Sequence, residues 1–210
     1  MSAASGGRAA ARRRGRGLAL LAAVVLVPGL VTTGLAGGAR AMEVGGINVP
    51  DTYVVDGTTL RLNGAGVRTL TLLEVKIYVA ALYLTQPMHD GRAIEASPGP
   101  KVLTLRFLHE GSKTQVERQY RAGEQENCGG GGCSAADGPD FERLIALAPA
   151  VKVGDSTTYI FTTQGVTVLA NDRVLAKFAN PDLGFRLLNG FLGATPPSKT
   201  LRAALLGVSG

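Results

Sequence analysis

Two cysteines are the residues of this sequence whose type and spacing point most directly to chemistry. Cys128 and Cys133 are separated by four glycines, so a flexible linker holds the two thiols close together. In an oxidising compartment such a pair closes a small disulfide, which stabilises at the low end of the usual range of about 2 to 4 kcal/mol because the loop is short. Free thiols, or a metal or redox site, stay open as alternatives. A metal site needs further ligands, and His89 and His109 are far away in the sequence with no ligand-like spacing.

The other reactive residues form no pattern typical of a hydrolase or a phosphate-binding site. The sequence contains no Ser-His-Asp order and no clustered pair of carboxylates. The Gly64-x-Gly66 turn lacks the third glycine and the strand-turn-helix context of a phosphate-binding loop. Arg68, just after this turn, is either a strand arginine facing water or a group that holds an anion. We therefore predict no cofactor and no metal.

The N-terminal segment has the order of a secretory signal. Five arginines between residues 8 and 16 precede an apolar run over residues 18–27, and small residues follow up to Ala39-Arg40-Ala41. The apolar run is shorter than the ~20 residues that span a bilayer. We predict a signal peptide over residues 1–41, a mature domain over residues 42–210, and a periplasmic or secreted location. A membrane anchor, an organellar transit peptide and a twin-arginine signal are the alternatives.

The net charge of +6 does not indicate a nucleic acid partner. Six of the 22 basic residues precede residue 42 and none of the 16 acidic ones does, so the mature chain carries 16 of each and is formally neutral. A basic footprint for nucleic acid is therefore absent from the mature domain. Its length fits one domain with a single core.

The elements that position these residues are strands first and helices later, without alternation. Asp56-Gly57 predicts a tight hairpin, and Ser112-Lys-Thr-Gln115 predicts the start of a helix. We expect strands over residues 52–55, 58–62, 67–73, 75–84, 102–108, 157–163, 165–169 and 174–178. Helices are expected over residues 113–126 and 140–148, after Asn180-Pro181, and over residues 201–206. This order predicts an α+β fold in which helices cover one face of a large antiparallel sheet, with an apolar seam between the two layers.

Several segments resemble the chalcone isomerase family, and in particular its bacterial exported chalcone isomerase-like branch. The similarity is carried, in order along the mature chain, by Val44–Pro50, Leu62–Arg68, Val75–Leu84, Leu105–Leu108, Lys152–Asp155 and Leu192–Gly207. The cysteine loop departs from the family pattern and resembles a local insertion. The resemblance implies the open-faced sheet and helix layer that the residue patterns also predict.

The resemblance also implies a site in the seam. In plant enzymes of the family, an arginine after the Gly-rich turn attracts a phenolate while hydroxyl groups and water polarise a ketone; in non-catalytic relatives the arginine holds a fatty acid carboxylate. These positions correspond here to Arg68 for the arginine, Tyr78 for a strand threonine and Thr114 for a helix tyrosine. Two further positions fall near Arg121 and Gly190, so most of the catalytic hydroxyls are unmatched.

This asymmetry favours binding over catalysis. One arginine suffices to hold a carboxylate through two charge-assisted hydrogen bonds, and a buried arginine implies an anionic partner, which is either a ligand or an internal acid. We predict a protein that binds a small amphipathic carboxylate, such as a fatty acid, and has no stable membrane span after cleavage of the signal. The alternatives are an intramolecular lyase or isomerase acting on a chalcone-like substrate, and a cell-envelope module that makes contact through the cysteine loop.

Overall fold

The strands lie side by side in the order in which they follow one another along the chain. A computed structural model describes residues 41–70, 74–128 and 137–208. Its strands are β1 (Ala41–Val44), β2 (Ile47–Pro50), β3 (Thr52–Val55), β4 (Thr58–Leu70), β5 (Val75–Leu84), β6 (Lys101–Phe107), β7 (Ser156–Thr162), β8 (Gly165–Ala170) and β9 (Arg173–Phe178). Its helices are α1 (Gly91–Ala96), α2 (Lys113–Cys128), α3 (Asp137–Leu147), α4 (Pro181–Leu192) and α5 (Lys199–Leu205). The predicted signal peptide, residues 1–41, lies outside the described residues apart from Ala41.

Strands β3 to β9 form one seven-stranded sheet, and every neighbouring pair in it is antiparallel. Two of its turns are tight hairpins in which both central residues have positive φ. Asp56 and Gly57 lie at 48° and 75°, and Asn171 and Asp172 at 48° and 61°. These dihedrals fit the type I′ turn, whose twist matches that of the flanking strands. Strands β1 and β2 form a separate hairpin.

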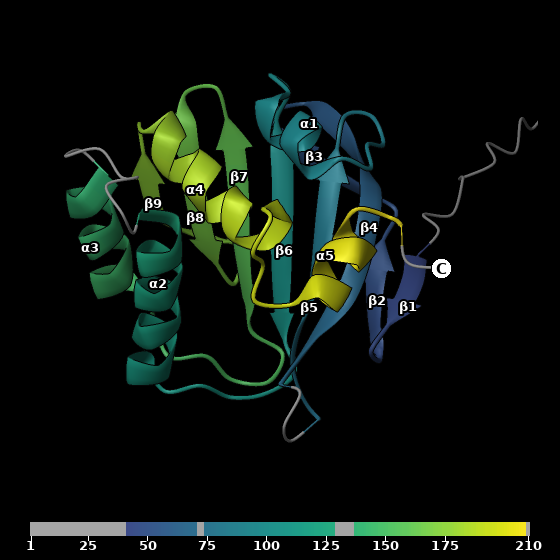
Figure 1. Cartoon of the computed structure of the whole chain (residues 1–210). Helices are drawn as coiled ribbons and strands as arrows, with labels where there is room; N and C mark the ends of the chain where they lie inside the picture. Colours follow the sequence, from purple (N-terminus) through teal and green to yellow (C-terminus); the bar gives the residue numbers. More distant parts are fainter. Residues whose placement is uncertain (1–40, 71–73, 129–136, 209–210) are drawn as a thin grey trace, which may run out of the picture. The chain divides into compact units, whose positions relative to one another are not determined.

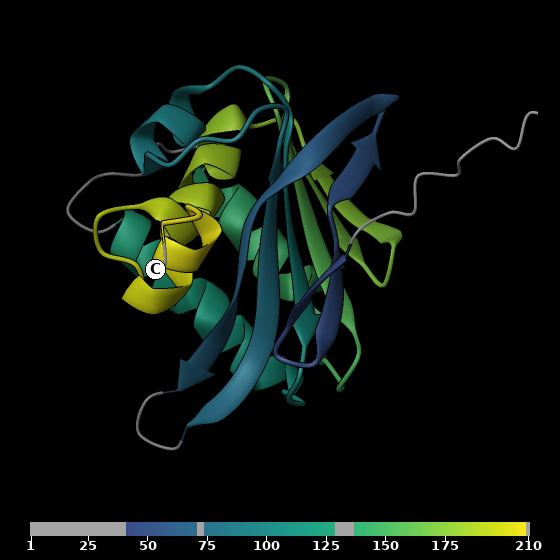
Figure 2. The same cartoon turned by 90° about the vertical axis from the view of Figure 1, so that its right-hand side faces the viewer.

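All five helices pack on one face of this sheet, as Figures 1 and 2 show. Alternate residues of each strand point to opposite faces, and β5 illustrates this clearly. Ala80, Leu82 and Leu84 belong to the core under the helices, whereas Val79, Ala81 and Tyr83 belong to a second core on the other face. The predicted α+β fold, with a helix layer on a large antiparallel sheet, is therefore confirmed.

The second face of the sheet is covered by the β1–β2 hairpin, which the sequence patterns did not predict. Val49 of β2 is buried against the outer side of the sheet, and Val44 and Ile47 pack beside it. Figure 2 shows the hairpin on the side opposite the helices. The sheet thus lies between two layers, a thick helical one and a thin one made by four-residue strands.

The Gly64-x-Gly66 segment is part of one long strand, so the prediction of a turn between two strands is wrong. The ladder between β4 and β5 continues through Gly64 and Gly66 with an irregularity after Leu62. A Cβ atom on Gly64 would lie 2.0 Å from the carbonyl oxygen of Ala204, and one on Gly66 would lie 2.6 Å from the Cβ of Ala204. The two glycines therefore let α5 approach the strand closely.

The helix starts follow the capping residues of the sequence. Asn180 and Ser198 accept backbone N–H bonds from Leu183 and Leu201 at the starts of α4 and α5. At α2, the Gln115 side chain accepts from the Ser112 N–H at 2.7 Å, and the Gln115 N–H donates to Ser112 Oγ at 3.3 Å. This is the reciprocal capping box that the sequence predicts.

Several helix boundaries differ from the sequence prediction by one to three residues, among them the end of α2 at Cys128 and both ends of α5, Lys199–Leu205. Helix α3 begins at Asp137 rather than Asp140, and α1, capped by Asp90, was not predicted. Among the described residues, none of the helices combines the length and apolar character needed to cross a bilayer.

Candidate functional site

Arg68 and Tyr78 lie directly opposite each other on β4 and β5. Tyr78 packs against the core under the helices, and opposite residues of an antiparallel pair share a face, so Arg68 also points to the helix side. Arg68 is half-buried, and its Nη1 donates a hydrogen bond to the Thr69 carbonyl oxygen at 3.2 Å. The two positions implied by the family resemblance are therefore together at the seam.

Two further tyrosines extend this group across the seam. The hydroxyl oxygens of Tyr120 on α2 and Tyr159 on β7 are 2.6 Å apart. The Tyr78 ring meets Phe107 edge to face, with ring centroids 6.0 Å apart. We refer to Arg68, Tyr78, Tyr120 and Tyr159 as the arginine–tyrosine cluster. It places one cation and three hydroxyl groups in an otherwise apolar layer.

The three phenols of this cluster are neutral at neutral pH. Burial raises the pKa of Tyr78 to about 12, although the positive charge of Arg68 acts in the opposite direction. Burial also raises the pKa of Tyr120 and raises that of Tyr159 well above its ordinary value, with Tyr120 adding to the effect. A neutral phenol both donates and accepts hydrogen bonds, so the cluster can bind an anion or polarise a carbonyl group.

Thr114, the third predicted site residue, is exposed in the first turn of α2. The structure does not bring it to the arginine–tyrosine cluster, and Tyr120 takes that place from further along the same helix. The sequence held a signal for this: Val116 and Tyr120 are four residues apart in an otherwise polar helix, and both are half-buried. Arg121, near which the resemblance placed a further position, instead pairs with Glu142 on α3 at 2.7 Å and is exposed.

Gly190 lies on α4 where that helix faces α2. A Cβ atom placed on it would lie 3.6 Å from Asn127 Nδ2, so this position borders the α2–α4 contact and offers no hydroxyl. Of the five positions that the resemblance assigned, Arg68 and Tyr78 are in the cluster and the other three are not.

Helix α2 is attached to its neighbours mainly through polar contacts near its ends. Lys113 Nζ donates to the carbonyl oxygens of Ala146 and Ala148 on the α3 side. At the other end, Arg186 Nη1 donates to the Asn127 carbonyl oxygen at 2.9 Å and its Nε donates to the fully buried Asp137 at 3.0 Å. None of the sixteen residues of α2, all of which are described, is buried. This helix therefore packs on the seam less tightly than the others.

Only one of the two cysteines of the predicted disulfide is among the described residues. Cys128 is the last residue of α2 and packs against the helix-side core, whereas Cys133 lies outside the described residues. The disulfide therefore stays a prediction. Across residues 41–70, 74–128 and 137–208, no group of three or more His, Cys, Asp or Glu side chains could hold a metal ion.

A curled antiparallel sheet with a helix layer on one face, and an arginine facing that layer beside a tyrosine, define the class of protein. The model of the chalcone isomerase-like family matches residues 41–207, and the chain belongs to this family. A fatty-acid binding protein of Arabidopsis thaliana has a similar crystal structure, with a TM-score of 0.59 and 14% sequence identity over 77% of this chain and 92% of that one. At this identity the likeness shows the fold. No curated protein matches the chain.

Proposed function

We propose that this protein is an exported, non-catalytic binding protein for a small amphipathic carboxylate, for example a fatty acid. The carboxylate contacts Arg68 and the Tyr78 hydroxyl, and the apolar tail runs along the seam between sheet and helices. The export part of the proposal rests on the N-terminal segment, and the ligand part rests on the arginine–tyrosine cluster.

The single observation that carries the ligand is the position of Arg68. It is half-buried on the helix side of the sheet, and it takes part in none of the three ion pairs found among the described residues. A guanidinium removed from water without a counter-charge is costly, and a carboxylate relieves this cost through two parallel hydrogen bonds. The sequence left three alternatives for Arg68: a strand arginine facing water, a partner of an internal acid, and a contact of an anionic ligand. Its half-buried position and its absence from the three ion pairs of the described residues favour the ligand.

The surroundings of Arg68 suit an amphipathic acid. Tyr78 is protonated at any pH well below 12, so its hydroxyl can donate a hydrogen bond to the carboxylate in addition to those from Arg68. Beyond it lies the helix-side core, in which apolar side chains such as Leu105 and Leu188 are buried, and a tail that enters the seam would pack among them. Helix α2 has no fully buried residue, and among its apolar contacts with this core are those of Tyr120 and Cys128. The structurally similar Arabidopsis thaliana protein is a fatty-acid binding protein, which agrees with this ligand class.

Catalysis on a chalcone-like substrate is the second candidate, and the three phenols of the cluster are the observation in its favour. General acid–base catalysis requires these groups to be positioned on the reacting atoms. Thr114, Arg121 and Gly190 supply no hydroxyl to the cluster, so we expect no loss of chalcone absorbance on adding the protein. Such a loss, abolished in Arg68→Gln, would favour the enzyme.

Native mass spectrometry and titration with a fatty acid such as palmitate test the binding proposal. We expect wild type to bind and Arg68→Gln to bind ten- to about a hundredfold more weakly, since a hydrogen bond to a charged group contributes about 1.5 to 3 kcal/mol. Tyr78→Phe should weaken binding by a smaller factor. Arg118→Gln, which changes an exposed arginine of α2, is the matched control. Binding that Arg68→Gln leaves unchanged would refute the role of Arg68.

Sequencing the N-terminus of protein recovered from the cell envelope and the medium of the expressing host tests export separately. A mature chain that begins near Met42 is the expected result. Intact Met1 in the cytoplasmic fraction alone would contradict the export part and leave the ligand part standing.

A further inference from the structure

A small cavity lies on the face of the sheet opposite the helices, beneath the β1–β2 hairpin. Its volume is about 150 Å³. Ile47, Val49 and Pro50 of the hairpin form its roof, and side chains of β5, β6 and β7 form its floor. A cavity of this volume accommodates a molecule about as large as benzene, so its occupant has roughly six to eight non-hydrogen atoms.

The floor of this cavity is apolar on one side and polar on the other. It consists of two neighbouring rows across the sheet, because Val79 is paired with Arg106 and Arg106 with Ser156, while Ala81 is paired with Thr104 and Thr104 with Thr158. Strands are about 4.8 Å apart and alternate residues about 7 Å apart, so these rows cover an area of about 10 by 7 Å. On the β5 side, Val79 and Ala81 contribute carbon atoms only and Tyr83 adds an aromatic ring with a hydroxyl group. The β6 and β7 side contributes one guanidinium and three hydroxyl groups.

Two opposite charges lie at the polar side. The Arg106 Nη1 donates to the Gly154 carbonyl oxygen at 2.8 Å, which leaves the other donors of its fork for a further partner. Asp172 lies in the β8–β9 turn and also lines the cavity. Neither side chain takes part in an ion pair among the described residues. Both residues are exposed, so the cavity has a cation and an anion at its solvent-facing edge that do not neutralise each other by direct contact.

The turn that carries Asp172 is fixed by its neighbour Asn171. Asn171 Oδ1 accepts the Ser156 N–H at 2.7 Å, and its Nδ2 donates to Asp155 Oδ1 at 3.0 Å. These two bonds tie the turn to the start of β7, so the backbone at Asp172 is held in place before any ligand binds. Preorganisation of this kind lowers the entropic cost of binding.

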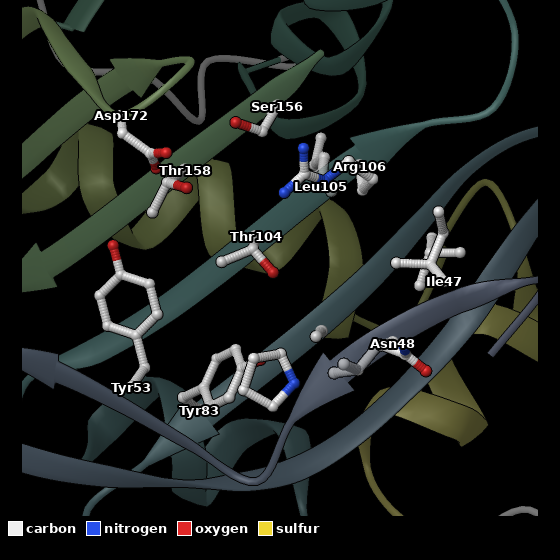
Figure 3. Close-up of a pocket in the computed structure, with 14 residues that line it drawn as sticks. Ile47, Asn48, Tyr53, Tyr83, Thr104, Leu105, Arg106, Ser156, Thr158 and Asp172 are labelled. Carbon is white, nitrogen blue, oxygen red and sulfur yellow. The ribbon is translucent and has the colours of Figure 1, made fainter. Parts of the chain in front are cut away.

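Tyr53 closes the acidic end of the cavity. Figure 3 shows its hydroxyl directed toward Thr158 and Asp172, with Arg106 beside Ser156. Burial and the negative charge of Asp172 raise the pKa of Tyr53, and a hydrogen bond from Thr158 acts the other way. Tyr53 is therefore a neutral phenol beside a carboxylate, and the group of oxygens formed by Tyr53, Thr158 and Asp172 suits an ammonium ion.

We propose that this cavity binds a small zwitterion, such as a free α-amino acid with a short branched apolar side chain. Arg106, with Ser156 and Thr104 near it, takes the carboxylate. Asp172, with Tyr53 and Thr158, takes the ammonium group, and Val79, Ala81 and Ile47 contact the side chain. L-Valine has the required size and all three kinds of group. This site lies across the sheet from the arginine–tyrosine cluster, so the proposal is independent of the proposed carboxylate site.

Calorimetric titration of the full chain with L-valine tests the proposal. We expect saturable binding with a dissociation constant on the order of 1 mM or tighter. Arg106→Gln and Asp172→Asn should each weaken binding at least about tenfold. Asparagine tolerates the positive φ of Asp172, so the second variant keeps its turn. Arg118→Gln and Arg68→Gln, away from the cavity, should leave valine binding unchanged.

Two analogues that each lack one charge separate the roles of the two ends. Isovalerate lacks the ammonium group and isobutylamine lacks the carboxylate, and each should bind at least about tenfold more weakly than L-valine. In wild type, amide NMR shifts induced by L-valine should map to Thr104, Thr158 and Asp172. This last readout does not depend on any variant folding.

Three results would overturn the proposal. One is the absence of saturable valine binding at about 10 mM, a tenfold excess over the expected constant. Another is equal affinity for valine and isovalerate, which would mean that Asp172 does not recognise an ammonium group. The third is unchanged binding in variants of Arg106 and Asp172 that melt at the wild-type temperature.

Discussion

Replacing Gly64 by alanine tests the close contact between β4 and α5. The added Cβ would lie 2.0 Å from the Ala204 carbonyl oxygen and 2.8 Å from that of Leu205. Both atoms are backbone, so no side-chain rotation relieves the clash and α5 must move away. The movement also stretches the hydrogen bond from Asn63 Nδ2 to the Leu205 carbonyl oxygen, which is 2.8 Å long.

The expected loss of stability follows from what this movement exposes. Overpacking in a close-packed layer costs about 1 to 3 kcal/mol. Leu201 and Leu205 of α5 are 4% and 0% exposed, and full burial of one leucine contributes about 1.5 to 3 kcal/mol. If α5 lifts enough to wet part of either side chain, the free energy of unfolding falls by about 3 kcal/mol or more. For a domain of this size, the melting temperature then drops by roughly 6 to 12 °C.

Urea and thermal unfolding followed by circular dichroism provide the measurement, and Gly123→Ala is the matched control. Gly123 lies inside α2, and no described atom is within 4 Å of a Cβ added there. The same substitution should therefore stabilise the protein by about 0.5 to 1 kcal/mol through helix propensity. A loss below about 1 kcal/mol for Gly64→Ala, the lower bound for overpacking, would refute the account of close approach by α5.

Three further predictions concern the tyrosines and the cysteines. Tyr120→Phe leaves the Tyr159 hydroxyl without its partner and should lower the free energy of unfolding by about 1 to 3 kcal/mol. In a double-mutant cycle, Tyr159→Phe should lower it much less in the Tyr120→Phe background than in wild type. Additive losses would contradict the hydrogen bond. The pKa of Tyr78 is about 12 in the folded state and 10.0 ordinarily, so the unfolded chain loses this proton first. The free energy of unfolding should therefore fall as pH rises from about 10 to 12. In Tyr78→Phe, this fall with pH should be less steep. Protein recovered from the exported fraction without reductant should show no free thiol, whereas two reactive thiols would exclude the disulfide between Cys128 and Cys133.

Local patterns were sufficient to predict most of the sheet. Strand alternation and hairpin residues such as Asp56-Gly57 act within a few residues of each other, so they can be recognised without the fold. The helix caps at Ser112, Asn180 and Ser198 are equally local. The order of these elements then limits the architecture to a layer of helices on an antiparallel sheet.

The misses share a different cause, which is contact between distant segments. Gly64 and Gly66 look like a turn until Ala204, about 140 residues later, is known to pack on them. Tyr120 joins the cluster because its hydroxyl reaches Tyr159 of β7, and no spacing within α2 indicates which strand its side chains reach. The cavity under the β1–β2 hairpin likewise combines β2, β6 and the β8–β9 turn. Arg68 and Tyr78 were found because the family resemblance carried this long-range information.

The sequential order of the strands has a kinetic consequence. Most strands join a neighbour after closing only a short loop, so the sheet can grow by adding strands in turn. The contact of α5 with β4 is different, since Asn63 and Leu205 are 142 residues apart and their contact closes a much longer loop. We expect α5 to dock after the folding transition state, so that Gly64→Ala speeds unfolding far more than it slows folding. The last helix would then be the one that sets how long each folded molecule lasts.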